Sequence, residues 1–377
     1  MKAKFAKVVA VIAAIGLAFG ASAAPARAAG STINLYISAD TNIQDLWQKT
    51  LIPEFNKVNP NYNIVVTFDR NGANDAQTLA KIVASRDTRR NPGIDLIDGG
   101  MVTTLGAAGL LYRFNTVAIP NLKDVPKVLI ENGKGGIPYR ASQVLLAYNS
   151  TNVKTPPKTL TALLAWIKAN PGKFTYNAPA GGGSGYSFVQ TVLDSQLTAA
   201  EIKTLATTED KTIQAKWSKG WEILRGLNKF TYGQNGTYPV NNAATLDLLS
   251  KGLVDVAPVW SDQIASAVKA GTMPKNIKTI SISGPSFTGG PAYLGILANG
   301  TNRPGARVLI NWLLSPAGQN LIVAGSMNGL PVIPVSKLDP VAAAGIADLD
   351  ITTMRPPYVS ANANNVRSGW ATEVPGK

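Results

Sequence analysis

The chain has 377 residues, and its 36 Lys and Arg against 22 Asp and Glu give a formal charge of +14 at pH 7. It contains neither histidine nor cysteine. The lack of histidine excludes Ser-His-Asp and Cys-His nucleophilic sites and most zinc and iron sites, and the lack of cysteine excludes disulfides. A basic chain can bind nucleic acid, but no cluster of basic and aromatic residues and no nucleic-acid motif occurs here. We therefore expect no nucleic-acid partner.

Residues 1–29 have the pattern of a secretory signal peptide. The segment carries no acidic residue, begins with three lysines, continues with an apolar run at 8–19 and ends in small residues suited to cleavage. The run is shorter than the roughly 18 apolar residues that a membrane-spanning helix needs. Removal of these 29 residues, four of them basic, leaves 348 residues with a charge of +10, enough for two lobes. We expect a free periplasmic protein.

The segment that follows predicts strands alternating with helices. Strands are expected at 32–38, 62–68 and 94–97, helices at 42–56 and 76–85, and a further helix from about residue 102. This order is typical of a parallel sheet covered by helices, in which ligands bind at the carboxyl ends of strands. Asp40 and Thr41 follow the first strand, and Gly99 and Gly100 follow the third. We select these four residues as candidate ligand contacts, with helix caps and turns as the alternative.

A glycine-rich loop is the most suggestive feature of the middle of the chain. An apolar strand is expected at 144–149, a helix at 159–168, a short strand at 174–177 and a helix at 186–193. Between the last two lies a loop with four glycines in five residues. Such a loop at a helix start exposes unpaired N–H groups, which favour an anion or a ligand oxygen. We select Gly183, Ser184, Gly185 and Tyr186, with a flexible connection capped by serine as the alternative.

The next strand, at 253–260, ends at Trp260, and Asp262 can cap the helix expected at 263–270. A further strand is expected at 278–283. The segment from Ala292 to Gln319 then predicts a buried strand that begins at Tyr293, a polar turn and an amphipathic helix.

The amino-acid sequence of this last segment resembles the C-terminal part of the family 1 extracellular solute-binding proteins, the capture subunits of bacterial ABC importers. The match covers 302–306 and 310–319, and the segments 142–149 and 253–263 also resemble that family. The resemblance implies an α/β type II periplasmic-binding-protein fold, with two lobes, a hinge and a cleft between the lobes. It implies that lobe I comprises 30–145 plus 285–313, and lobe II 146–284 plus 314–377.

The resemblance also implies a function. The protein would capture a small solute in the cleft and deliver it to an ABC permease and its ATPase at the inner membrane, acting as a monomer, without cofactor, metal or catalysis. In the family, the segment around Trp260 presents an aromatic ring to the cleft, and Tyr293 would lie just beyond the return crossing between the lobes.

Several ligand classes remain open. An anion such as a phosphate or phosphonate ester suits the glycine-rich helix start and the basic charge, and we favour it slightly. A cationic amine or thiamine-like compound suits Asp40, Asp98 and Asp262 beside Trp260 and Tyr293, through charge and cation–π contacts. A neutral sugar stays open. Ferric iron comes last, because the chain has neither a tandem tyrosine pair nor histidine.

The alternative from a different functional class is a secreted carbohydrate-active hydrolase or lyase, working with Asp or Glu, Tyr or Lys. Acidic residues are few, and no motif marks two of them as a catalytic pair.

Overall fold

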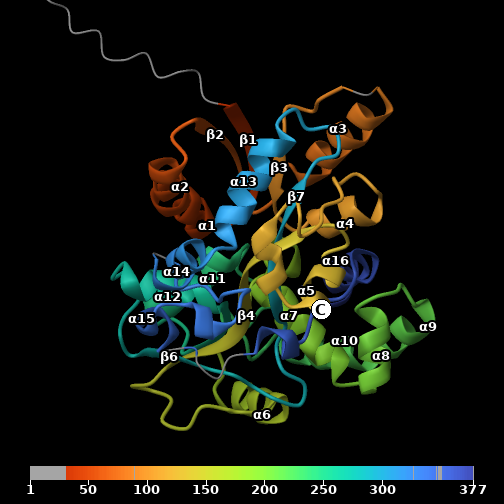
Figure 1. Ribbon diagram of the computed structural model, residues 1–377. Coiled ribbons are helices and arrows are strands. Elements are labelled where there is room, and N and C mark those ends of the chain that lie inside the picture. Colours follow the sequence, from red (N-terminus) through yellow and green to blue (C-terminus); the bar gives the residue numbers. More distant parts are fainter. Residues whose placement is uncertain (1–30, 89, 326, 345, 347–349, 377) are drawn as a thin grey trace, which may run out of the picture.

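The computed structural model describes residues 31–88, 90–325, 327–344, 346 and 350–376 (Figure 1). The expected signal peptide lies outside these residues. Within them, no helix is both long enough and apolar enough to cross a bilayer.

The first lobe is built on a mixed sheet with strand order β2-β1-β3-β7-β4. The strands β1 (Ser31–Ala39), β2 (Tyr62–Arg70) and β3 (Leu96–Asp98) are parallel, and β7 (Gly289–Ile296) is antiparallel to β3 and β4 (Ile137–Asn149). The predicted alternation of strands and helices is confirmed here. Because β1 and β3 are parallel neighbours, with Ile37 opposite Asp98, their carboxyl ends meet at one edge of the sheet.

The helix expected at 42–56 is present but changes form in its middle. It consists of α1 (Thr41–Asp45), a π-helical segment η1 (Leu46–Leu51) and α2 (Ile52–Val58). Its apolar face is buried, since Ile43, Leu46, Trp47 and Phe55 are at most 4% exposed. Burial of this face fixes the start of α1 next to the carboxyl end of β1.

The second lobe uses the carboxyl half of β4. Residues 144–149 pair in antiparallel fashion with β5 (Val256–Trp260) and β6 (Ile277–Ile280). The helices that pack on this sheet are α7 (Gly183–Asp194), α11 (Asn242–Ser250) and α12 (Ser261–Lys269). The helix α6 (Leu160–Ala169) contributes to the same buried core.

The prediction of a strand at 174–177 is wrong. Phe174 forms only isolated bridges, to Thr231 and Val256. The aromatic residues of this segment pack into the core instead, with the rings of Phe174 and Tyr176 centred 5.1 and 4.7 Å from that of Phe188.

The other helices surround the two sheets (Figure 1). Those that pack on the first lobe are α3 (Asp75–Asp87), α4 (Val102–Ala107), α5 (Lys127–Asn132), α13 (Arg303–Leu313), α14 (Pro316–Ala324) and α15 (Pro340–Ala343). Those of the second lobe are α8 (Ala199–Leu205), α9 (Lys211–Gln214), α10 (Ser218–Gly226) and α16 (Ser360–Glu373).

Each lobe has one large cluster of buried side chains, here the first and the second core, beside a smaller one, and β4 passes from the first core to the second. Tyr139 and Ala141 of β4 belong to the first core, whereas Val144 and Leu146 belong to the second. The C-terminal part of the chain also divides. Buried apolar residues from 314 to 351 lie in the first core, and those from 358 to 374 lie in the second.

This packing differs from the expected boundary, which assigned all of 314–377 to lobe II. The reason is α14, which is anchored on the first lobe by Gln319. The side-chain amide of Gln319 donates to the carbonyls of Tyr139 and Leu313 at 2.8 and 2.9 Å, and its oxygen accepts from the N–H of Val332 at 2.8 Å. We therefore propose that 314–351 belongs to lobe I, so that the segment after residue 351 is a third crossing between the lobes.

Candidate ligand-binding site

Asp40 stands at the carboxyl end of β1 and at the N-cap of α1, but its side chain does not cap that helix. Its carboxylate instead accepts a hydrogen bond from Nδ2 of Asn242, at 2.8 Å. Asn242 begins α11 in the second lobe, so this bond joins the two lobes. The neighbouring Thr41, the first residue of α1, is exposed.

Gly99 and Gly100 follow β3 at the same edge of the sheet. A Cβ atom on Gly99 would lie 2.9 Å from Cβ of Ser38, so this glycine permits close packing of the two strand ends. Gly100 is exposed and faces open space. A packing role therefore explains Gly99, while Gly100 leaves room beside the strand end.

The glycine-rich segment is more regular than expected, because α7 begins at Gly183 rather than at Tyr186. The N–H groups of Ser184 and Gly185 donate to the side-chain oxygens of Asn242 and Asn177, at 3.3 and 3.0 Å. The hydroxyl of Ser184 lies 2.8 and 2.9 Å from the same two oxygens. Two of the N–H groups expected to meet an anion are thus already paired with neutral amides.

Gly183 allows an aromatic ring to lie against the helix start. A Cβ atom on Gly183 would lie 2.5 Å from Cζ2 of Trp260. Trp260 ends β5 and is half-buried. The structure therefore brings the start of α7 and the predicted aromatic contact together.

Asp262 lies in the first turn of α12 and is buried. Its carboxylate accepts from the hydroxyl of Ser142 at 2.6 Å and from Nδ2 of Asn42 at 3.3 Å, and it lies 3.9 Å from Nη1 of Arg140. Asn42 belongs to α1, so Asp262 forms a second polar link between the lobes.

Asp98, by contrast, is held within the first lobe. Its Oδ2 accepts from Nε1 of Trp47 at 2.8 Å and from the hydroxyl of Tyr139 at 2.5 Å. The Tyr139 oxygen in turn accepts from Nε of Arg140, at 2.7 Å. This chain of bonds holds the Arg140 guanidinium on the crossing strand β4, between Asp98 and Asp262.

The electrostatics of the site are those of partly dehydrated carboxylates. Burial raises the pKa of Asp40 above its ordinary value; the hydrogen bond from Asn242 and the charge of Arg140 oppose this rise, and the carboxylate of Asp262 adds to it. Asp40 and Asp262 are therefore near enough for their carboxylates to repel each other, and the guanidinium of Arg140 supplies the positive charge that opposes this repulsion.

Two hydrogen-bond acceptors in the same region have no donor. Oδ1 of Asn42 and Oε1 of Gln263 are both buried and lack a partner within the described part of the chain. Asn42 contacts Asp262, and Gln263 is the next residue along α12. A buried acceptor without a donor costs about 1–3 kcal/mol, so these oxygens favour a ligand that donates hydrogen bonds.

The two predicted tyrosines are not joined to this network. The ring of Tyr186 is buried, its hydroxyl has no hydrogen-bond partner among the described residues, and the guanidinium of Arg367 lies 5.1 Å from the ring centroid. Burial raises the pKa of that hydroxyl. The hydroxyl of Tyr293 donates to the carbonyl of Leu129, at 3.0 Å, within the first lobe. Hydrogen bonds connect Asp40 with Ser184 through Asn242, and a separate bond connects Asp262 with Asn42; neither group includes these tyrosines.

Sequence reasoning missed the asparagines and the glutamine. An N-cap signal does mark the start of α11, where Oδ1 of Asn241 accepts from the N–H of Ala244 at 2.9 Å. That signal locates a helix start, but it does not show that Asn242 contacts Asp40, 202 residues away. Within the described residues, no group of three or more His, Cys, Asp or Glu could hold a metal ion.

Comparison with known proteins agrees with this architecture. "Protein YnjB" of Escherichia coli (strain K12) is 24% identical over 257 residues, an alignment that covers 66% of this chain and 66% of that protein. The periplasmic binding protein AfuA from Actinobacillus pleuropneumoniae, solved with exogenous fructose-6-phosphate bound, superposes with a TM-score of 0.64 at 16% identity, covering 91% of this chain and 98% of that one. Iron-bound HitA from Pseudomonas aeruginosa does so with a TM-score of 0.63 at 17% identity, covering 90% and 98%.

The expected type II periplasmic-binding-protein fold is therefore confirmed. A family model described as a bacterial extracellular solute-binding protein matches residues 50–348, which is more than half of the chain. This chain belongs to the bacterial extracellular solute-binding proteins.

Proposed function

We propose that this protein captures a small organic cation with N–H groups between its lobes and delivers it to an ABC permease and its ATPase. It acts as a monomer in the periplasm after removal of residues 1–29, and it performs no chemistry on the ligand. Family membership supports binding and transport. The observation that carries the ligand class is the excess of acceptors where the lobes meet.

That excess has two parts. Asp40 and Asp262 bring two carboxylates against the one guanidinium of Arg140, and the unpartnered oxygens of Asn42 and Gln263 add two neutral acceptors. An ammonium or amidinium group would supply charge and several donors at once. The nearby ring of Trp260 can add a cation–π contact.

A phosphate or phosphonate ester, the class that the sequence favoured, fits this arrangement less well. It would have to displace the amide oxygens of Asn242 and Asn177 from the N–H groups of Ser184 and Gly185. It would also approach the carboxylate of Asp40, which Asn242 contacts. A secreted hydrolase or lyase is the other alternative, and turnover of a polysaccharide by the purified protein would support it over import.

A thermal-shift screen tests the ligand class. We expect putrescine, agmatine or thiamine to raise the melting temperature by mass action, and glycerol phosphate and glucose to leave it unchanged. A shift produced only by glycerol phosphate would contradict the cation proposal. Hinge closure upon binding, measured by small-angle scattering, would support transport over catalysis.

Binding of the cation should depend on pH. Because the pKa of Asp40 lies above its ordinary value, the carboxylate takes up a proton at a higher pH than a free aspartate does. Protonation removes one negative charge from the site, so affinity for putrescine should fall as pH falls through this raised pKa. Isothermal titration calorimetry from pH 7.5 to 3.5 measures the effect, and an affinity that does not fall anywhere in this range would contradict a role for Asp40 as a ligand group.

Gly183→Ala should weaken cation binding by about fivefold or more, the ~1 kcal/mol of a cation–π contact. The added methyl group would displace the Trp260 ring, which lies 2.5 Å from the position of the new atom. Gly226→Ala in α10 is the matched control, because its Cβ meets no atom within 4 Å. Equal affinity in both variants would show that the Trp260 ring does not contact the ligand.

A further inference from the structure

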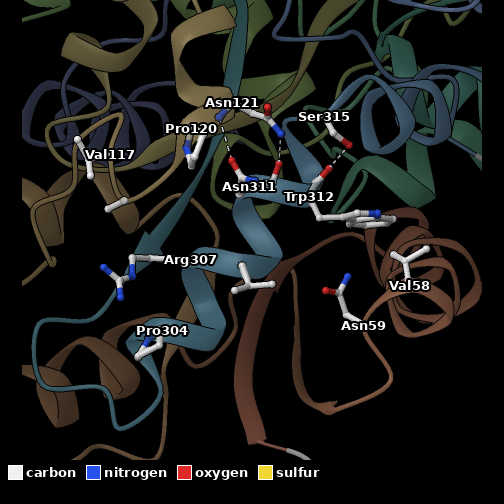
Figure 2. A pocket seen from close by; sticks show the side chains of 12 residues that line it. Val58, Asn59, Val117, Pro120, Asn121, Pro304, Arg307, Asn311, Trp312 and Ser315 are labelled. Atoms are coloured by element: carbon white, nitrogen blue, oxygen red, sulfur yellow. Dashed lines mark hydrogen bonds between the residues drawn. The ribbon is translucent and has the colours of Figure 1, made fainter.

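A cavity of about 680 Å³ lies along the exposed face of α13, in the first lobe (Figure 2). We call it the α13 groove; its floor is the helix face, and its two sides are Val58–Asn59 and the segment around Val117. The floor residues are Pro304, Arg307, Val308, Asn311 and Trp312 of α13, together with Ser315, which precedes α14.

The groove is separate from the candidate ligand site. The residue before α13, Asn302, donates from Nδ2 to the hydroxyl of Ser31 and the carbonyl of Thr32, at 2.6 and 2.7 Å, at the amino end of β1. Asp40 follows the carboxyl end of that nine-residue strand, roughly 25–30 Å away at ~3.3 Å per residue. That distance applies to the end of the groove at Pro304, and no described residue that lines the groove forms a hydrogen bond or ion pair with Asp40 or Asp262. We therefore expect changes in the groove to leave ligand binding intact.

Its walls carry exposed apolar side chains next to Asn59 and Asn121, and the aromatic ring between them is held in place. Val117 is 87% exposed and Val58 is 65% exposed, on opposite sides of the half-buried Trp312. The Trp312 ring packs edge-on against Phe55, with 5.5 Å between ring centroids, so the protein core holds its orientation. Exposed apolar side chains gathered around a held aromatic ring are typical of an interaction surface.

Hydrogen bonds also fix one side of the groove to the helix. The N–H of Asn121 donates to Oδ1 of Asn311, and Nδ2 of Asn121 donates to the carbonyl of Asn311, both at 2.8 Å. The segment that carries Val117 and Asn121 is thus held at a set distance from α13.

The charge of the groove is positive and uncompensated. Arg307 is the one charged residue among those that line it, and no acidic residue does. The guanidinium groups of Arg303 and Arg307 lie 5.3 and 5.9 Å from the centroid of the Tyr112 ring. Within the described chain, neither arginine forms an ion pair. The occupant that complements this surface is acidic.

We propose that the α13 groove docks an acidic amphipathic helix on the outer side of the membrane permease, an inference that rests on the proposed function. Val308 and Trp312 lie one turn apart on a helix of eleven residues, about 16 Å long, which matches three turns of a partner helix. A second copy of this chain would oppose arginine with arginine. A small organic anion would leave most of the wall exposed, because Val117 and Val58 are open to solvent.

Docking to a cognate ABC permease–ATPase complex, reconstituted in nanodiscs, tests the proposal. Biolayer interferometry should show that Val117→Asp and Arg307→Glu each raise the Kd by about tenfold or more, since each opposes the acidic partner. Val341→Asp, at a valine 88% exposed outside the groove, and Arg90→Glu are the matched controls and should dock as the wild type does. Raising the salt concentration from 50 to 300 mM should weaken the wild type more than Arg307→Glu.

Each other outcome overturns the proposal. Groove variants that dock like the wild type would exclude this surface. Binding of the wild type to phosphatidylglycerol vesicles that Arg307→Glu abolishes would assign the groove to the lipid surface, and a dimer that Val117→Asp dissociates would assign it to a second copy. If the wild-type protein shows the ligand-induced thermal shift but does not dock, the delivery part of the proposed function is contradicted as well. If docking is lost only in the control variants, this inference alone is contradicted.

Discussion

Replacing Asp40 with asparagine is expected to weaken putrescine binding by roughly 30-fold, or about 2 kcal/mol, the usual contribution of a hydrogen bond to a charged group. The substitution keeps the shape of the side chain and removes its negative charge. An asparagine oxygen can still accept the 2.8 Å hydrogen bond from Asn242, so the link between the lobes survives while the charge does not. Isothermal titration calorimetry at pH 7.5 and low salt measures the change.

Asp45→Asn is the control for this variant. Asp45 lies on the same helix and pairs with Lys49 at 2.9 Å, but its side chain is 46% exposed and it takes no part in the network between the lobes. Loss of the Asp45 charge should leave the Kd for putrescine unchanged. The pH dependence of binding should also vanish in Asp40→Asn and persist in Asp45→Asn. Unchanged affinity in Asp40→Asn would mean that the ligand does not contact this carboxylate.

Arg355→Ala is expected to lower the free energy of unfolding by about 3–5 kcal/mol, because it leaves a buried charge without a partner. Arg355 forms an ion pair with Asp194 of α7, whose side chain has no exposed surface, and it donates to Thr191 and to the carbonyl of Ser286 at 2.5 and 2.7 Å. Tyr358 donates to the other oxygen of Asp194. These contacts fasten the segment that contains Arg355 and Tyr358 to α7, the helix that begins at the candidate ligand site.

The pH dependence of this loss has a definite sign. Burial raises the pKa of Asp194 already in the intact protein, and Arg355 opposes that rise. Without the arginine, the folded-state pKa rises further above the unfolded value. Stability linked to Asp194 is then present at low pH and is lost as pH rises through the folded pKa. Urea unfolding should therefore show a smaller deficit at pH 5 than at pH 8.

Two variants control this experiment. Arg225→Ala removes a surface ion pair with Glu373, with side chains 32% and 47% exposed, and should cost less than about 1 kcal/mol. Asp194→Asn added to Arg355→Ala should regain part of the loss, because it removes the unpaired charge. If Arg355→Ala stayed within 1 kcal/mol of the wild type, the ion pair would not hold the crossing to α7.

Local patterns were sufficient to locate most of the elements that build the fold. The alternation of apolar residues at 32–38 and 62–68 marks β1 and β2, and the spacing of Leu309 and Leu313 marks the buried side of α13. These patterns succeed because a strand or helix with one buried face repeats its apolar residues at its own period. The amino-acid sequence of 292–319 also indicated the family, and the family model that matches residues 50–348 confirms it.

The same patterns do not record which distant partner a residue contacts. The glycine-rich segment predicts N–H groups open to an anion, and in the fold Asn177 and Asn242 accept hydrogen bonds from two of them. The sequence also gives no sign that Gln319 contacts the carbonyl of Tyr139, 180 residues away, which is the contact behind our proposed lobe boundary.

The sequence by itself determined the order of β1 to β7 and of the helices with a clear apolar face, the family, and the identity of several polar residues at strand ends, because a segment with one buried face repeats its apolar residues at a regular spacing. Only the tertiary structure decided which of those polar residues meet. Asp40 accepts a hydrogen bond from Asn242, 202 residues away in the sequence, and Asp262 accepts one from Asn42, 220 residues away. Such contacts arise from the way two lobes close on each other, and no local pattern records them.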